Sequence, residues 1–260
     1  MREIWQETCA LRFGAVDRSD RLTLAATFDF FQEAAINHAE DLGVGREAVL
    51  KNGQGWILSR ISVVLEHRPK YRETITIRSW PRGGERLFAV RDYDIRDASG
   101  VPIVRGRSGW LILDLEKRRP LRPQSMMDKL PLNAGLDALP DGPAALETRD
   151  NLNKAGERRA VYSDIDYNGH VNNARYIQWI QDITDPEILE KADTLRLDIN
   201  YLRETKINEI TDLWTAPLTG SGITAALAYE GRRQEGGQAT FRAELRTGGP
   251  GCIDPLLPRG

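Results

Sequence analysis

Hydrophobic residues recur at helical spacing in two places, once in each half of the chain. The first set is Phe28, Phe31, Ala35, His38 and Leu42, and the second is Ala174, Ile177, Ile180 and Ile183. Gly43 follows the first set, and Asn172 or Asn173 can cap the second, which ends near Asp185 and Pro186. The patterns predict one helix in each half.

Each helical pattern is followed by segments in which hydrophobic and polar residues alternate, as in half-buried strands. They span residues 73–80, 87–95 and 103–115 in the first half, and 195–203, 223–230 and 239–246 in the second. Turn residues at 98–100 and 235–237 separate neighbouring segments, as antiparallel hairpins require. One helix on an antiparallel sheet, repeated once, predicts an α+β protein.

The two halves also match residue by residue. A shift of 136 residues pairs Pro81 with Pro217 and Tyr93 with Tyr229, and a shift of 149 pairs Asp17 with Asp166 and Gln32 with Gln181. A longer connector at 42–56 accounts for the difference. We therefore expect an internal pseudo-dimer whose sheets pair edge to edge, with residues 61–106 superposing on 197–242.

Composition and charge exclude several classes of protein. The 260 residues carry 36 basic and 38 acidic side chains, which disfavours disorder and general nucleic-acid binding. No apolar run could span a membrane, and the start lacks a signal core, so we expect a cytoplasmic protein. The expected domains are an N-terminal repeat at 1–115, a linker at 116–157, a C-terminal repeat at 158–247 and a tail at 248–260.

The densest polar cluster lies just before the second helix. Asp166, Asn168 and His170 supply a carboxylate, an amide and an imidazole within five residues, beside the free N–H groups of a helix start. That environment suits an oxyanion, although such residues also form ordinary turns. The first half has Ser19 and Arg21 where the second has Asn168 and His170, which favours catalysis in the second half alone.

The run DIDYNGHVNNARYIQWI, followed by INYLRET, resembles the catalytic half of the acyl-ACP thioesterases. RLTLAATFDFFQEAAINHAEDLG and RISVVLEHRPKYRETITIRSWPRG resemble their N-terminal half, so the resemblance covers roughly residues 4–245. It implies a duplicated hotdog fold, a non-catalytic N-terminal half that helps to form the acyl pocket, and hydrolysis of fatty acyl-acyl carrier protein. It places Asp166, Asn168, His170 and Glu204 in the active site.

The resemblance also bears on partners and mechanism. It implies an acyl carrier protein as partner and no cofactor or metal, with a homodimer as a further option. Thr205 stands where plant members carry a cysteine long proposed as the nucleophile, so we expect no role for Cys9 or Cys252. A thiolate leaves readily, so hydrolysis needs an activated water or a carboxylate nucleophile, and a stabilised oxyanion. We expect Glu204 or Asp166 to activate the water with His170 as partner in proton transfer, while Asn168 and helix N–H groups orient the water or the carbonyl.

Three alternatives remain open: acyl-CoA hydrolysis, another hotdog reaction such as hydration, and a non-catalytic acyl-binding module. Several smaller features are interpreted more simply. Arg118, Arg119, Arg122, Arg232 and Arg233 are candidates for carrier docking or ordinary surface charges, His38 and His67 are interpreted as structural, and Trp56, Trp80 and Trp110 as core or pocket wall.

Overall fold

The computed structural model describes residues 2–122, 124–128, 130–143, 145–218 and 224–249. Its helices are η1 (Phe13–Ala15), α1 (Leu24–Asp41), α2 (Arg46–Leu50), α3 (Gln124–Met127), η2 (Tyr162–Asp164), α4 (Asn173–Ile183) and α5 (Pro186–Lys191). Its strands are β1 (Trp5–Ala10), β2 (Gln54–Leu65), β3 (Thr74–Glu85), β4 (Phe88–Arg96), β5 (Pro102–Asp114), β6 (Arg119–Leu121), β7 (Asn153–Arg159), β8 (Thr194–Tyr201), β9 (Ile210–Pro217), β10 (Ala225–Arg233) and β11 (Ala239–Gly248).

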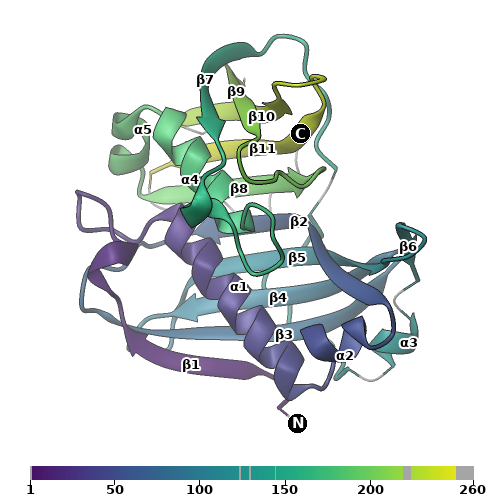
Figure 1. Cartoon of the computed structure of the whole chain (residues 1–260). Coiled ribbons are helices and arrows are strands. Elements are labelled where there is room, and N and C mark those ends of the chain that lie inside the picture. The colour runs from purple at the N-terminus through teal and green to yellow at the C-terminus, as the bar shows by residue number, and fades with distance from the viewer. Residues whose placement is uncertain (1, 123, 129, 144, 219–223, 250–260) are drawn as a thin grey trace.

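These strands form one antiparallel sheet in the described part of the chain. The order is β1-β3-β4-β5-β2-β8-β11-β10-β9-β7, with β6 paired to β5. The first half contributes the strands up to β2 and the second half those from β8 onward, so the halves join through β2 and β8 (Figure 1). The predicted edge-to-edge pairing of two α+β halves, a double hotdog, is confirmed.

The centre of the β2–β8 pair is a pseudo-twofold axis. Ser62 of β2 pairs with Asp198 of β8, and a shift of 136 residues makes these two positions equivalent in the two halves. Their side chains are hydrogen-bonded to each other. The β3–β4 and β9–β10 pairings follow the same shift, because Ile77 pairs with Ile95 and Leu213 with Gly231. The predicted equivalence of the halves is confirmed over these strands.

The equivalence slips by one residue in the last strand of each half. The turn that joins β4 to β5 closes from Asp97 to Val101, whereas its counterpart closes from Arg233 to Gln238. The second turn is one residue longer, so β5 superposes on β11 at a shift of 137. The predicted match of 61–106 with 197–242 is therefore wrong by one residue at its end, because an insertion in a turn leaves the hydrophobic alternation intact.

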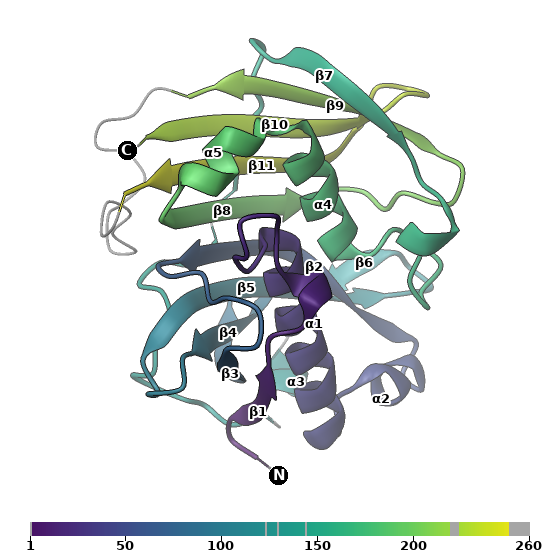
Figure 2. The same cartoon turned by 90° about the vertical axis from the view of Figure 1, so that its left-hand side faces the viewer.

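Helices α1 and α4 lie on one face of the sheet, with their N-terminal portions side by side (Figures 1 and 2). Thr23 and Asn172 cap them by accepting hydrogen bonds from Ala26 N and Ala174 N. Their buried side chains form the core together with the inward residues of the strands. The helix residues in this core include Phe28, Phe31, Ala35, Ala174, Ile177 and Ile180.

The opposite face of the sheet is crossed by the segment that joins the halves. Leu139 packs on Val64, Ala138 N donates to Asp92, and Arg149 donates to Glu244. Elements β6, α3 and the start of β7 lie within the range predicted as a linker. Strand β7 was not predicted, because it is an outer edge strand of mostly exposed polar residues and shows no hydrophobic alternation.

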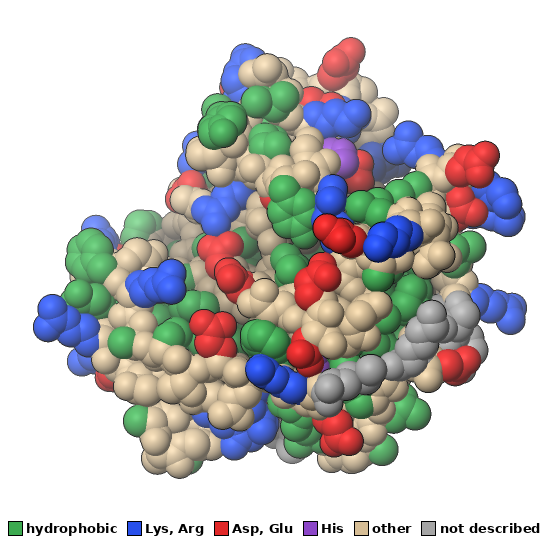
Figure 3. All heavy atoms as spheres, turned by 60° about the horizontal axis from the view of Figure 1, so that its bottom comes forward, with side chains coloured by type: hydrophobic (Ala, Val, Ile, Leu, Met, Phe, Trp, Pro, Cys, Tyr) green, Lys and Arg blue, Asp and Glu red, His purple; other side chains and the backbone are tan. Residues whose placement is uncertain are grey.

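Acidic and basic side chains are interspersed on the face shown in Figure 3, as the formal net charge of −2 suggests. In the described residues, no helix is long and apolar enough to cross a membrane. The cytoplasmic location stays a prediction. Most of the predicted tail, including Cys252, lies outside the described residues.

Candidate active site

The polar cluster before α4 forms a tight turn that folds back on itself. Asp166 N donates to His170 O and Gly169 N donates to Asp166 O, both at 2.9 Å. Asp166 Oδ1 accepts from Asn168 N at 2.8 Å, and Gly169 has a φ of +82°, which favours glycine. Val171 N donates to Thr205 O, which holds the turn against the chain that follows β8.

The first half contains the same turn with different side chains. Asp17 N donates to Arg21 O, Asp20 N donates to Asp17 O, and Asp17 Oδ1 accepts from Ser19 N. Leu22 N donates to Pro69 O, and Val171 N donates to Thr205 O. The two bonds are equivalent, because Leu22 matches Val171 at the shift of 149 and Pro69 matches Thr205 at the shift of 136. Arg21 thus occupies the place of His170, as predicted.

The second turn brings His170 against Glu204, although 34 positions separate them in the sequence. His170 Nε2 lies 3.0 Å from Glu204 Oε2, and the two side chains are 29% and 49% exposed, so both remain accessible to substrate. Arg233 Nη2 donates to the Glu204 carbonyl oxygen at 3.0 Å and fixes the backbone there. The pair joins an imidazole to a carboxylate, an arrangement suited to moving a proton.

Asn168 lies at the exposed tip of the turn, where a residue from the other half contacts it. The Nε of Arg46, the first residue of α2, donates to Asn168 Oδ1 at 3.4 Å, and its guanidinium lies over the Tyr167 ring at 5.1 Å. Sequence analysis missed Arg46 because one arginine in a connector carries no motif.

The carboxylate of Asp166 shapes the turn through its bond to Asn168 N, as Asp17 does in the first half. Beside the pair, Thr205 is buried, and the Tyr176 hydroxyl lies within reach of its side chain. Tyr176 lies below in the core, where burial raises the pKa of its hydroxyl to about 12. The polar site therefore lies directly against the hydrophobic core.

A recess reaches from the start of α4 into the first half, between α1 and the sheet. It is lined by Phe28, Phe31, Gln32, Leu58, Ile61, Tyr93, Trp110 and Asn173. Phe31 stacks on Tyr93 with ring centroids 4.6 Å apart. The lining is mostly apolar and aromatic, which matches a hydrocarbon chain in chemistry, but the free space is about 10 Å³, enough for one water molecule. A chain would enter only if these side chains moved apart.

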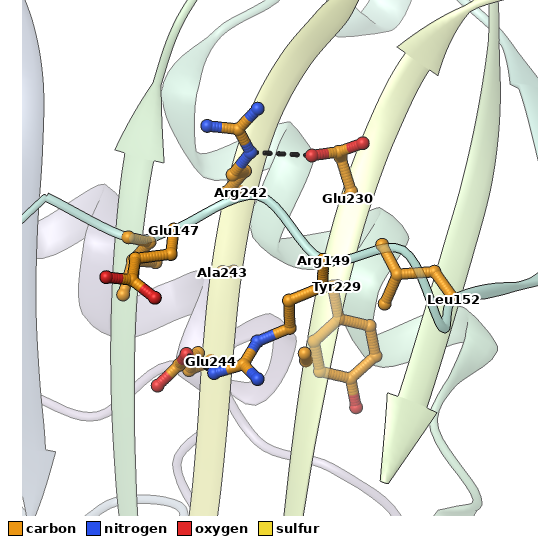
Figure 4. A pocket seen from close by; sticks show the side chains of 10 residues that line it. Glu147, Arg149, Leu152, Tyr229, Glu230, Arg242, Ala243 and Glu244 are labelled. Atoms are coloured by element: carbon orange, nitrogen blue, oxygen red, sulfur yellow. Dashed lines mark hydrogen bonds and ion pairs between the residues drawn. The ribbon is translucent and has the colours of Figure 1, made fainter. Parts of the chain in front are cut away.

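A second recess lies between the joining segment and strands β10 and β11, where Glu147, Arg149 and Leu152 face the sheet (Figure 4). Four of its charged side chains are paired within the chain: Glu230 accepts from Arg242, and Glu244 accepts from Arg149. This recess is on the face opposite the helices, away from the polar turn.

Some of the smaller interpretations are confirmed, whereas the structural role of His67, which is exposed, stays a prediction. His38 is buried between Arg2 O and Arg91 Nη1, and burial lowers its pKa. Trp80 is a core residue and Trp110 lines the recess. Among the docking candidates, Arg232 pairs with Glu230 and Arg233 with Glu209, whereas Arg118, Arg119 and Arg122 are exposed. In the described residues, no group of three or more His, Cys, Asp or Glu could hold a metal ion.

Two domain families match most of the sequence. Residues 2–129 match the acyl-ACP thioesterase N-terminal domain, and residues 148–247 match the acyl-ACP thioesterase C-terminal domain. The gap between them falls in the segment that crosses the outer face of the sheet.

Curated relatives and solved structures agree with these matches. A palmitoyl-acyl carrier protein thioesterase of Cuphea hookeriana is 24% identical over 99% of this chain, which spans 65% of that relative's length. An acyl-ACP thioesterase structure from Bacteroides thetaiotaomicron covers 94% of this chain and 97% of its own, at 24% identity and a TM-score of 0.78. A 12:0-ACP thioesterase structure from Umbellularia californica covers 94% and 93%, at 22% identity and a TM-score of 0.79.

Proposed function

The chain belongs to the acyl-ACP thioesterase family, and from this we propose that it hydrolyses the thioester of fatty acyl-acyl carrier protein in fatty acid biosynthesis. The observation that carries the proposal is the His170–Glu204 pair in the half that has the complete polar set. Water adds to the acyl carbonyl carbon, the C–S bond breaks, and the products are a free fatty acid and the carrier thiol.

His170 and Glu204 supply the proton transfers in this proposal. When Nε2 donates to Glu204, the Nδ1 lone pair is left to take a proton from the attacking water, and the carboxylate stabilises the imidazolium. The imidazolium then returns the proton to the departing sulfur. A thiol pKa of about 8.5 makes the thiolate a good leaving group, so this modest acid suffices.

Asn168 and Asp166 have supporting parts. The Asn168 side-chain amide donates to the oxyanion that forms on the carbonyl oxygen. The N–H groups of Ala174 and Arg175 at the start of α4 already bond to Asn172, so they supply no donor. The Asp166 carboxylate holds the turn in shape, so we assign water activation to the His170–Glu204 pair rather than to Asp166.

The first half supplies the acyl pocket. The recess under α1 begins beside Asn173 and is lined by Phe31, Tyr93 and Trp110. A chain whose thioester lies at the polar turn would extend into it once these side chains separate, because the free space is about 10 Å³. We therefore propose a C-terminal catalytic repeat and an N-terminal repeat that binds the acyl chain, in a protein that is cytoplasmic and either monomeric or a homodimer.

Turnover of acyl-ACPs and acyl-CoAs of graded chain length, measured side by side, tests the proposal. We expect a higher kcat/KM on acyl-ACP, because the partner is the carrier protein. Faster hydrolysis of acyl-CoA would favour the acyl-CoA thioesterase reading. Stoichiometric acyl binding without turnover would favour a binding module.

A further inference from the structure

We infer that Arg46 is a positioning residue that orients the Asn168 amide, so that the first half completes the catalytic site of the second. Arg46 reaches the turn across the boundary between the halves and contacts two consecutive residues there. Its Nε donates to Asn168 Oδ1 at 3.4 Å, and its guanidinium lies over the Tyr167 ring. The inference rests on the proposed function for its kinetic test.

The backbone of Arg46 is itself anchored. Glu40, near the end of α1, accepts a hydrogen bond from Arg46 N at 2.9 Å. A Cβ atom at Gly45 would lie 2.1 Å from the Glu40 carboxyl carbon, so only glycine lets the carboxylate approach this closely. The start of α2 is thus fixed before the arginine side chain extends to the turn.

The contact determines which end of the amide faces the substrate. An asparagine side chain has an oxygen that accepts and an NH₂ group that donates. Because Arg46 engages Oδ1, the two N–H donors turn to the other side, where they can donate to the oxyanion. Without Arg46 the amide can rotate and present its oxygen, which would repel the developing negative charge.

The pseudo-twofold axis provides a matched control. In the first half, Arg18 occupies the position of Tyr167, and it pairs with Glu190 of α5, the short helix of the opposite half. This contact also joins a turn to a short helix across the boundary, and Arg18 is likewise exposed. It lies at the turn that lacks the polar set, so its loss removes an equivalent surface contact without touching the catalytic turn.

Steady-state kinetics of Arg46→Gln and Arg18→Gln, alone and combined with Asn168→Ala, form the first test. We expect Arg46→Gln to lower kcat roughly tenfold, the effect of about 1.4 kcal/mol on a barrier, with KM almost unchanged. It should lower kcat no further in Asn168→Ala, and Arg18→Gln should match the parent. An equal loss from Arg46→Gln with and without Asn168 would overturn the inference.

The second test does not need turnover. The side-chain amide ¹⁵N–¹H signals of Asn168 should shift in Arg46→Gln and stay in place in Arg18→Gln, because only the former loses the contact. Unchanged signals in Arg46→Gln would refute the orienting role. A parent protein that hydrolyses no acyl thioester, yet shows the shift, would overturn the proposed function and leave the orienting role supported.

Discussion

The two polar turns have the same backbone conformation. They differ in the side chain that contacts each turn from the segment after the next strand, β2 in the first half and β8 in the second. In the first half, Arg68 lies at the position of Glu204. It is buried, donates to Leu22 O and Leu189 O at 2.8 Å, and pairs with Asp17. In the second half, Glu204 is exposed and contacts His170 instead.

The comparison shows how one supersecondary unit serves two purposes. The guanidinium of Arg68 uses its three nitrogens to connect Asp17 in the turn, Leu22 just after the turn, and Leu189 in α5 of the other half. The carboxylate of Glu204 leaves its turn open, with an imidazole beside it. The reversal of charge from Arg68 to Glu204, together with Asn168 in place of Ser19 and His170 in place of Arg21, separates a structural junction from a reactive one.

The largest effect is expected from removing the imidazole. His170→Ala should lower kcat by roughly 10²–10⁴-fold, because the imidazole carries the proton in the proposed mechanism. Arg21→Ala, at the equivalent position, should keep the parental kcat. Thioester hydrolysis assays on both folded proteins make the comparison, and near-parental activity in His170→Ala would refute the assignment.

Glu204→Gln is expected to reduce kcat by roughly 10²-fold or more, since the amide keeps the size of the side chain but cannot stabilise an imidazolium. Asp166→Asn keeps an oxygen that can accept from Asn168 N, so it should retain more activity. If Asp166→Asn proves the more damaging of the two, then Asp166 rather than Glu204 is the carboxylate that takes part in chemistry. The readout is kcat for each variant.

The junction in the first half should matter for stability and not for chemistry. Arg68→Met leaves the Asp17 carboxylate without its partner, and breaking such a buried pair costs about 3–5 kcal/mol at most. We expect a free energy of unfolding lowered by about 2–4 kcal/mol in urea titrations, with kcat of the folded fraction unchanged. A large fall in kcat without loss of stability would mean that the first turn takes part in catalysis.

Features that arise from neighbouring residues in the sequence could be predicted, whereas contacts between distant residues could not. The helices and inner strands show in the hydrophobic periodicity, and the polar set at Asp166, Asn168 and His170 is contiguous. Edge strands β1 and β7 are mostly polar on both faces, so periodicity does not mark them. Contacts such as Arg68 with Asp17, or Arg46 with Asn168, join residues 51 and 122 positions apart, and single residues give no sign of such pairings.

The smallest effect is expected from removing the thiols. Cys9 lies on β1, five strands from β8 in the sheet, or roughly 24 Å along it. Burial, the largest cause, raises the pKa of its thiol above the ordinary value, so at neutral pH the reactive thiolate is scarce. The variant with Cys9→Ser and Cys252→Ser should therefore match the parent in activity, and its activity should withstand thiol-alkylating reagents.

Thr205→Val extends the same argument to the hydroxyl beside Glu204. A hydroxyl nucleophile needs a base within hydrogen-bond reach. The group beside the buried Thr205 side chain is the Tyr176 hydroxyl, whose pKa of about 12 keeps it protonated at neutral pH, so it is no base. Valine keeps the branched shape and removes one hydroxyl, so kcat should stay close to the parental value and the free energy of unfolding should fall by about 1–2 kcal/mol at most. An acyl-enzyme trapped at Thr205, or a hundredfold loss of kcat in Thr205→Val with the fold intact, would show that the nucleophile is the threonine hydroxyl and not water. Loss of activity in the cysteine-free protein alone would instead point to a thiol outside the turn.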